Sequence, residues 1–207
     1  MATPKTEKVD LFKLHKDDYV KPKAPLLIEL AEARFLAVDG VGSPGGEMFA
    51  ARIGALYGMA YTIKFTSKFA GRDFAVCKLE AVYGAGGRFA ELGELPQEEW
   101  PWRMLIRVPE FIGDGDLDAA RATLREKKKP GDFDAVRLDT ITEGSCVQML
   151  HVGPYEEEER TIALINAFCA DEGLTPHRWH HEIYLSDPRR VPPERLKTIL
   201  RQPVVSS

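Results

Sequence analysis

The sequence contains few cysteines and no long apolar segment. Its three cysteines, Cys77, Cys146 and Cys169, are odd in number, far apart and set among apolar residues. This usage argues against a disulfide framework and against a zinc site, and it predicts buried thiols. No stretch approaches the roughly 18 apolar residues of a membrane span, and the first ten residues lack the apolar core of a secretory signal. We therefore expect a cytoplasmic protein without a membrane partner.

An excess of positive charge is also missing. The 207 residues carry 28 Lys and Arg against 32 Asp and Glu, so the formal net charge is −4, and the positive residues are scattered. Because binding to a phosphate backbone needs clustered positive charge, the sequence argues against a direct nucleic-acid partner. The hydrophobic share of 44% is enough for the core of an ordinary globular protein of one or two units.

The first half of the chain predicts a strand, a long helix and two further strands. Residues 1–24 are expected to form a polar leader, and residues 33–41 a strand that the glycines and proline of 42–46 end. The next segment predicts a helix of roughly five turns, because its apolar residues recur at steps of four and three. These residues are Phe49, Ile53, Leu56, Ala60 and Ile63. Residues 74–83 and 102–108 are rich in aromatic and branched residues and predict an antiparallel pair.

A linker helix, capped by Asp116 and ended at Pro130, leads to the second half. There, four glutamates at 156–159 begin a helix, where negative charge suits the positive end of the helix dipole. The buried stripe of this helix is expected to consist of Ile162, Ile165, Phe168 and Cys169. The strands of the second half are expected at 135–142, 146–152, 180–187 and 198–205.

The two halves resemble each other, which indicates an internal duplication. Each has a strand, a Gly/Pro turn, an amphipathic helix and a strand with a central glutamate, Glu80 in one half and Glu182 in the other. Neither half can cover its own sheet, but two halves can join their sheets and leave a groove between the helices. We predict an α+β fold in which residues 25–207 form one domain of two pseudo-repeats, about 25–112 and 133–207. Its antiparallel sheets and two long helices would leave a central ligand groove.

Glu182 is the first candidate for chemistry. Alternation along a strand places His180, Glu182 and Tyr184 on one face, and His181 and Ile183 on the other. The apolar face is expected to meet the helix, so the polar face looks into the groove. A carboxylate beside an aromatic ring would there be partly desolvated, and its pKa would be raised as a general acid or base requires. The alternative is an ordinary solvated glutamate on an open strand face.

Glu80 has the matching place in the first half. Two carboxylates facing each other across the groove could divide the acid and base roles, because each disfavours ionisation of the other. Rigid aromatic side chains at strand ends could hold a planar ligand, although strand aromatics are as often part of a core. The aromatic candidates are Tyr83, Trp102, Tyr155 and Tyr184, with Phe111 and Trp100 as secondary ones. His180, on the same strand face as Glu182, is a further candidate for ligand contact.

Four histidines raise the question of a metal. His180 and His181 are consecutive in a predicted strand, so they point to opposite faces, and a three-ligand site with His177 or His151 would need a bend that the sequence does not signal. We expect no metal. The sequence also lacks a nucleophile elbow, a phosphate loop and a dinucleotide fingerprint, so no cofactor is expected.

Several strings of the sequence point to a family. QMLHVGPYEEEERTI, HHEIYLSDPRRVPPERLKTILRQPV, WPWRMLIRVPEFI and KLEAVYG together resemble the GyrI-like family of small-molecule-binding proteins, in particular its stand-alone bacterial branch. The resemblance extends over about residues 20–205. It implies a duplicated SHS2 module (β-α-β-β), with the groove glutamate of the family at Glu182 and a first-half carboxylate at Glu80. One departure is Tyr83-Gly84, where the family pattern has an aromatic pair.

The resemblance implies that a planar lipophilic small molecule is the partner, but it leaves the activity open. Relatives include drug-sensing domains of transcription regulators, proteins linked to gyrase inhibition, and hydrolases that open the cyclopropane ring of DNA-alkylating toxins. Only about 25 residues precede the module, which disfavours a regulator. Our leading hypothesis is a protective hydrolase of cyclopropanoid toxins, in which Glu182 activates water. The alternatives are a non-catalytic drug binder and a gyrase-inhibitor-like protein. The oligomeric state is left open, with a monomer as one option.

Overall fold

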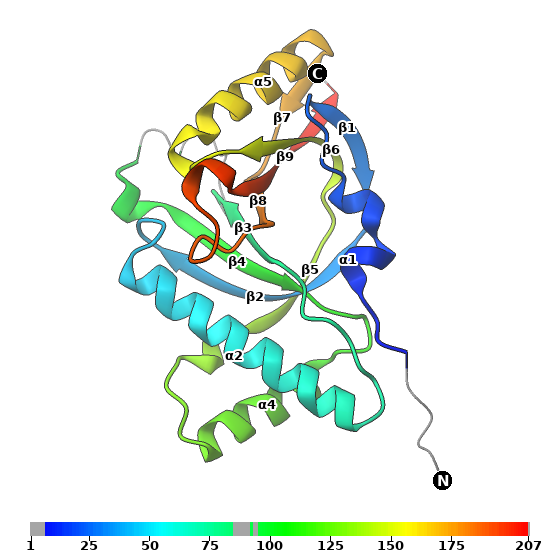
Figure 1. Ribbon diagram of the computed structural model, residues 1–207, viewed down its shortest axis with the longest axis vertical. Coiled ribbons are helices and arrows are strands. Elements are labelled where there is room, and N and C mark those ends of the chain that lie inside the picture. The colour runs from blue at the N-terminus through cyan, green and yellow to red at the C-terminus, as the bar shows by residue number, and fades with distance from the viewer. Residues whose placement is uncertain (1–6, 85–91, 93–94, 207) are drawn as a thin grey trace.

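One large antiparallel sheet organises the computed structural model, which describes residues 7–84, 92 and 95–206 (Figure 1). The strand order is β1-β6-β9-β8-β3-β4-β2-β5, and β7 pairs with β9. The strands are β1 (Leu26–Leu30), β2 (Ala33–Val41), β3 (Leu79–Tyr83), β4 (Pro101–Arg107), β5 (Arg137–Ile141), β6 (Gly144–Val152), β7 (Leu174–Pro176), β8 (His180–Tyr184) and β9 (Lys197–Ser206). The α+β class with an antiparallel sheet is thus confirmed.

Helices precede, connect and cover these strands. The α-helices are α1 (Leu11–Leu14), α2 (Glu47–Phe69), α4 (Asp114–Glu126) and α5 (Glu158–Asp171). Short 3₁₀ turns are η1 (Lys16–Tyr19), η2 (Gln97–Glu99), η3 (Phe133–Ala135), η4 (Tyr155–Glu157) and η5 (Pro193–Arg195). Among the described helices, none is long and apolar enough to cross a membrane. The three cysteines are buried free thiols, as expected.

The sheet has a near-symmetrical order about its centre. There, β3 and β8 pair antiparallel, with Ala81 opposite Glu182. Outward from β3 lie β4 and β2, and outward from β8 lie β9 and β6. The edge strands are exchanged: β1 precedes β2 in the chain but pairs with β6, whereas β5 precedes β6 but pairs with β2. Each half is therefore completed by a strand that belongs, in sequence, to the other half.

The two long helices lie on either side of the central strand pair (Figure 1). α2 packs on β2 and β4, while α5 packs on β6, β7 and β9. The buried side of α2 carries Leu56, Met59 and Ile63, so the spacing of apolar residues correctly predicts this helix. Gly58 lets Phe133 approach, because a Cβ at position 58 would lie 2.9 Å from the Phe133 ring. Since neither helix covers β3 and β8, the centre of the sheet is left open to a groove.

The segment expected to be a polar leader is part of the fold from Val9 onward. α1 and η1 place Tyr19 on the sheet face opposite the groove, where it packs with Ile183 and Ile199 and is 4% exposed. The ring of Phe12 stacks on Tyr19 at 4.5 Å. The apolar face of β8 therefore meets this N-terminal segment, and our expectation that it meets a helix of the repeat is wrong. Tyr19 lies in a mostly polar stretch of the sequence, so the sequence gives little sign that it packs behind β8.

Candidate active site

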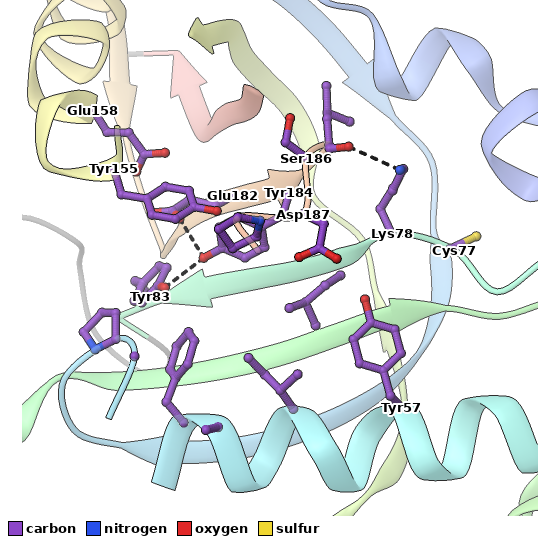
Figure 2. Close-up of a pocket in the computed structure, with 18 of the residues that line it drawn as sticks. Tyr57, Cys77, Lys78, Tyr83, Tyr155, Glu158, Glu182, Tyr184, Ser186 and Asp187 are labelled. Atoms are coloured by element: carbon purple, nitrogen blue, oxygen red, sulfur yellow. Dashed lines mark hydrogen bonds between the residues drawn. The ribbon is translucent and has the colours of Figure 1, made fainter. Parts of the chain in front are cut away.

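A groove runs between α2 and α5, and its floor is formed by β3 and β8 (Figure 2). Its volume is about 2060 Å³, larger than the roughly 300–1,000 Å³ of ordinary ligand pockets. Half-buried apolar and aromatic side chains of α2 form one wall. Its lining includes Phe49, Ile53 and Tyr57 from α2, Tyr83, Glu182 and Tyr184 from the floor, and Tyr155, Glu158 and Ile162 from the α5 side.

A chain of hydroxyl groups leads to Glu182 on the groove floor (Figure 2). The Tyr184 hydroxyl donates to Glu182 Oε2 at 2.8 Å and lies 2.9 Å from the Tyr83 hydroxyl. Because Tyr184 has one proton and gives it to Glu182, Tyr83 is the donor to Tyr184. Tyr155 packs edge-on against Tyr184, with ring centroids 5.8 Å apart. These contacts fix the orientation of the Glu182 carboxyl.

Glu158 completes an acidic pair with Glu182. It lies in the first turn of α5 and is 7% exposed, and its carboxyl is near enough to that of Glu182 for each to shift the pKa of the other. Burial raises the pKa of Glu158, and the charge of Glu182 raises it further. Burial also raises the pKa of Glu182, although the Tyr184 hydrogen bond and the charge of His181 partly offset this effect. A proton is therefore retained between the two carboxyls well above the ordinary carboxyl range, which gives one acid and one base in contact.

His180 is buried beside this pair and does not line the groove. Its Nε2 lies 3.8 Å from Glu182 Oε1. Burial, with the charge of His181 as a second cause, lowers the pKa of His180 to about 3. His180 is therefore neutral at physiological pH and adds no positive charge to the site. Among the described residues, no cluster of three or more His, Cys, Asp or Glu side chains has the geometry to hold a metal ion.

Comparisons with known proteins now bear on this arrangement. A family model described as the GyrI-like small molecule binding domain matches residues 119–205. An uncharacterized conserved protein from Listeria innocua is 40% identical, with 96% of this chain and 100% of that chain covered and a TM-score of 0.88. This chain belongs to the GyrI-like family. It therefore contains a small-molecule-binding domain of that family.

Two further structures refine the comparison of this GyrI-like protein. One is described as a hydrolase from Listeria innocua, with 40% identity, coverage of 96% of this chain and 100% of that chain, and a TM-score of 0.86. The other is the EcmrR C-terminal domain, with 12% identity, coverage of 88% and 98%, and a TM-score of 0.58. The second likeness shows the fold alone. No curated protein matches the chain.

Of the site residues predicted for this GyrI-like chain, Glu182, Tyr83, Tyr155 and Tyr184 meet in the groove. Glu80 does not. It lies on the opposite face of β3, where Tyr19 donates a hydrogen bond of 3.1 Å to its Oε1. Ala81 is the residue opposite Glu182, and a shift of one residue turns a strand side chain to the other face. The expectation that the two strand glutamates converge is therefore wrong.

Two aromatic residues are also elsewhere. Trp102 is 1% exposed in the core, where its Nε1 donates to the carbonyl oxygen of Gly42 at 2.9 Å. Phe111 packs edge-on against Phe74, outside the groove. Both expectations of ligand contact are wrong, because strand position alone does not tell which aromatic faces the core. Trp100 does line the groove.

Glu158 is the site residue that sequence reasoning missed. Its first-turn position had a sufficient explanation in the helix dipole, so it was not singled out. A signal was present nonetheless: the apolar stripe Ile162, Ile165 and Cys169 extends backward by one step of four to Glu158. A carboxyl group on the buried stripe of a helix indicates a partner or a function.

Proposed function

We propose that this protein hydrolyses planar, lipophilic electrophiles, with cyclopropanoid toxins as the substrate class, and so protects the cell. The observation that carries the proposal is the pair of carboxyls of Glu158 and Glu182, which both line an aromatic groove and whose pKa values are both raised by burial. Close structural relatives at 38–40% identity that are described as hydrolases support a hydrolytic reaction. The large groove volume suits a bulky substrate.

The reaction follows from the two protonation states of the pair. A cyclopropane fused to a dienone is strained, and its opening makes an aromatic phenol. Water attacks the cyclopropane methylene carbon while ionised Glu182 takes one of its protons. The new C–O bond forms as the ring C–C bond breaks, and the electron pair moves through the ring system to the carbonyl oxygen. Protonated Glu158 gives its proton to this oxygen, and the proton taken up by Glu182 then passes to the neighbouring carboxyl of Glu158, which restores the starting state.

The tyrosines orient both partners of the reaction. The Tyr184 hydroxyl holds Glu182 Oε2 and so fixes the orientation of the carboxyl that takes the proton from water. Phe49 from α2 and Tyr155 from η4 both line the groove, and aromatic rings suit a planar ring system. A fixed base and a fixed ligand reduce the entropic cost of bringing water to the reacting carbon.

Product analysis with a cyclopropanoid compound tests the proposal. The wild type should yield many ring-opened alcohol molecules per protein, detected by chromatography and mass spectrometry. Glu182→Gln should lower kcat about 100-fold or more, since it removes the general base. Glu172→Gln, which removes an exposed carboxyl at the other end of α5 and outside the groove, is the matched control and should retain the wild-type rate. A wild type without ring-opened product, or a Glu182→Gln variant as fast as the wild type, contradicts the proposal.

The same groove also favours a second candidate, a non-catalytic binder of planar cations. Here Glu182 would serve as the counter-ion, and the aromatic rings would stack on the ligand. Titration with a planar cation, followed by fluorescence, separates the two functions. Stoichiometric binding that Glu182→Gln abolishes, together with absence of turnover of a cyclopropanoid compound, supports the binder and excludes the hydrolase.

A further inference from the structure

Four charged side chains are buried together on the sheet face opposite the groove. Glu80 comes from β3, Glu143 from the turn before β6, His181 from β8 and Arg201 from β9. Their side chains are between 1% and 6% exposed. We call these four residues the buried quartet. Unpaired charges at such depth would be costly, so the quartet must balance itself.

His181 is the centre of the quartet. Its Nδ1 lies 2.9 Å from Glu143 Oε1, and its Nε2 lies 3.0 Å from Glu80 Oε2. Nδ1 is hydrogen-bonded to Glu143, whereas Nε2 is in ion-pair contact with Glu80, and these two carboxylates raise the pKa of His181 to about 9, so the ring is an imidazolium. Arg201 donates to Glu143 Oε2 at 2.6 Å. Two negative and two positive charges therefore sum to zero, and the protonated state of His181 is required for this balance.

The quartet joins the strand that carries Glu182 to its neighbours on both sides. His181 connects β8 to β3 through Glu80 and, through Glu143 and Arg201, to β9. β8 has only five residues, and its groove face is left open by both helices. His181 and Glu182 are consecutive residues of β8. The contacts of His181 therefore fix the backbone position from which the Glu182 side chain points into the groove.

The quartet also acts on Glu182 electrically. The imidazolium of His181 lowers the pKa of Glu182 and thus opposes the effect of burial. Several elements contribute the titratable groups that act electrostatically on Glu182: Glu158 from α5, Tyr155 from η4, Tyr83 from β3, and His180, His181 and Tyr184 from β8 itself. Around His181 lie Glu80, Glu143 and Arg201, with Tyr19 and Arg107 behind Glu80. Among these groups, His181 is the positively charged residue next to Glu182 in the strand.

We propose that His181, held by Glu80, Glu143 and Arg201, is a positioning residue for Glu182: it fixes the carboxyl in the groove and places a permanent positive charge behind it. This role rests on the proposed function, in which Glu182 is the base. Glu80 thereby contributes indirectly to the site, as the ion-pair partner of His181 on the sheet face opposite the groove.

The test compares His181→Gln and the charge-balanced double variant Glu80→Gln with His181→Gln. The double variant leaves the neutral pair Glu143 and Arg201, so it is expected to fold even if the single variant does not. His177→Gln, which lies outside the quartet, is the control. In the folded variants kcat at neutral pH should fall about tenfold while KM stays within twofold. The acid limb of the rate profile should move up by about one pH unit, because a nearby cation has been removed.

A readout independent of turnover separates this proposal from the proposed function. The Glu182 carboxyl carbon is followed by NMR during a pH titration and assigned by its absence in Glu182→Gln. Its titration midpoint should rise by about one unit in the variants and stay constant in His177→Gln. If the midpoint rises although the wild type opens no cyclopropane ring, the positioning role stands and the hydrolase fails. An unchanged midpoint, or a raised KM with unchanged kcat, overturns the positioning role.

Discussion

Replacing Glu158 by glutamine should make the protein more resistant to rising pH. The carboxyl of Glu158 is 7% exposed and next to Glu182, and its pKa is raised well above the ordinary value of 4.5. Between 4.5 and the raised pKa, the folded protein keeps a proton that the unfolded chain has lost. The stability of the wild type must then fall as pH rises through this window, because folding takes up a proton. Glutamine at this position has no proton to lose.

The magnitude follows from the one-proton difference. Each unit of pH within the window changes the relative free energy of unfolding by about 1.4 kcal/mol. From pH 5 to pH 8, Glu158→Gln should therefore gain up to about 4 kcal/mol over the wild type. Replacing Glu158 also removes an interaction that lowers the pKa of Glu182, so Glu182 keeps its own proton to a higher pH in the variant, and the gain is smaller than this upper value.

Urea denaturation at pH 5, 6, 7 and 8 measures this effect. The difference in unfolding free energy between Glu158→Gln and the wild type should rise steadily with pH. Glu159→Gln, which removes an exposed carboxyl from the same turn, should parallel the wild type at every pH. If the Glu158→Gln and wild-type curves are also parallel, Glu158 is not a buried, proton-retaining group, and the acid assigned to the reaction is lost.

Two further predictions concern the relay of hydroxyl groups and the core below it. Tyr184→Phe removes the 2.8 Å hydrogen bond to Glu182, so the acid limb of the pH–rate profile should move up by about one pH unit. Tyr155→Phe keeps that bond and should leave the acid limb in place. Equal acid limbs in the two variants would contradict the role of the Tyr184 hydroxyl. Gly40→Ala would bring a methyl group within 2.0 Å of the buried Trp102 ring and should cost about 1–3 kcal/mol in urea denaturation. A Cβ added at Gly54 would meet no atom within 4 Å, so Gly54→Ala should instead stabilise α2 by about 0.5–1 kcal/mol. An unchanged stability of Gly40→Ala would show that Trp102 is not packed as described.

The spacing of polar and apolar residues correctly predicted which face a side chain lies on when only one strand or helix is involved. The alternation along 180–184 correctly separates Glu182 and Tyr184 from His181 and Ile183, because a strand side chain has only two faces. The apolar stripe of α2 was equally informative. The division into two pseudo-repeats stays a prediction; in the structure β2-α2-β3-β4 is followed by β6-α5-β7-β8-β9, in which β7 is an additional strand.

Contacts between distant segments could not be predicted in this way. The match between Glu80 and Glu182 compares letters in two strands, whereas the pairing register sets Ala81 opposite Glu182. The exchange of β1 and β5 between the halves, and the packing of Tyr19 behind β8, depend on pairing over more than 100 residues. Glu158 was missed for a different reason: an adequate helix-dipole explanation hid its place on the buried stripe.

The most direct test of hydrolysis in this groove is the origin of the oxygen in the product. The wild type is incubated with an excess of a cyclopropanoid compound in ¹⁸O-labelled water, and the ring-opened alcohol is examined by mass spectrometry. Water activated by Glu182 predicts one labelled oxygen per product and many products per protein molecule. Product without the label, or no more than one ligand molecule consumed per protein, would contradict the account.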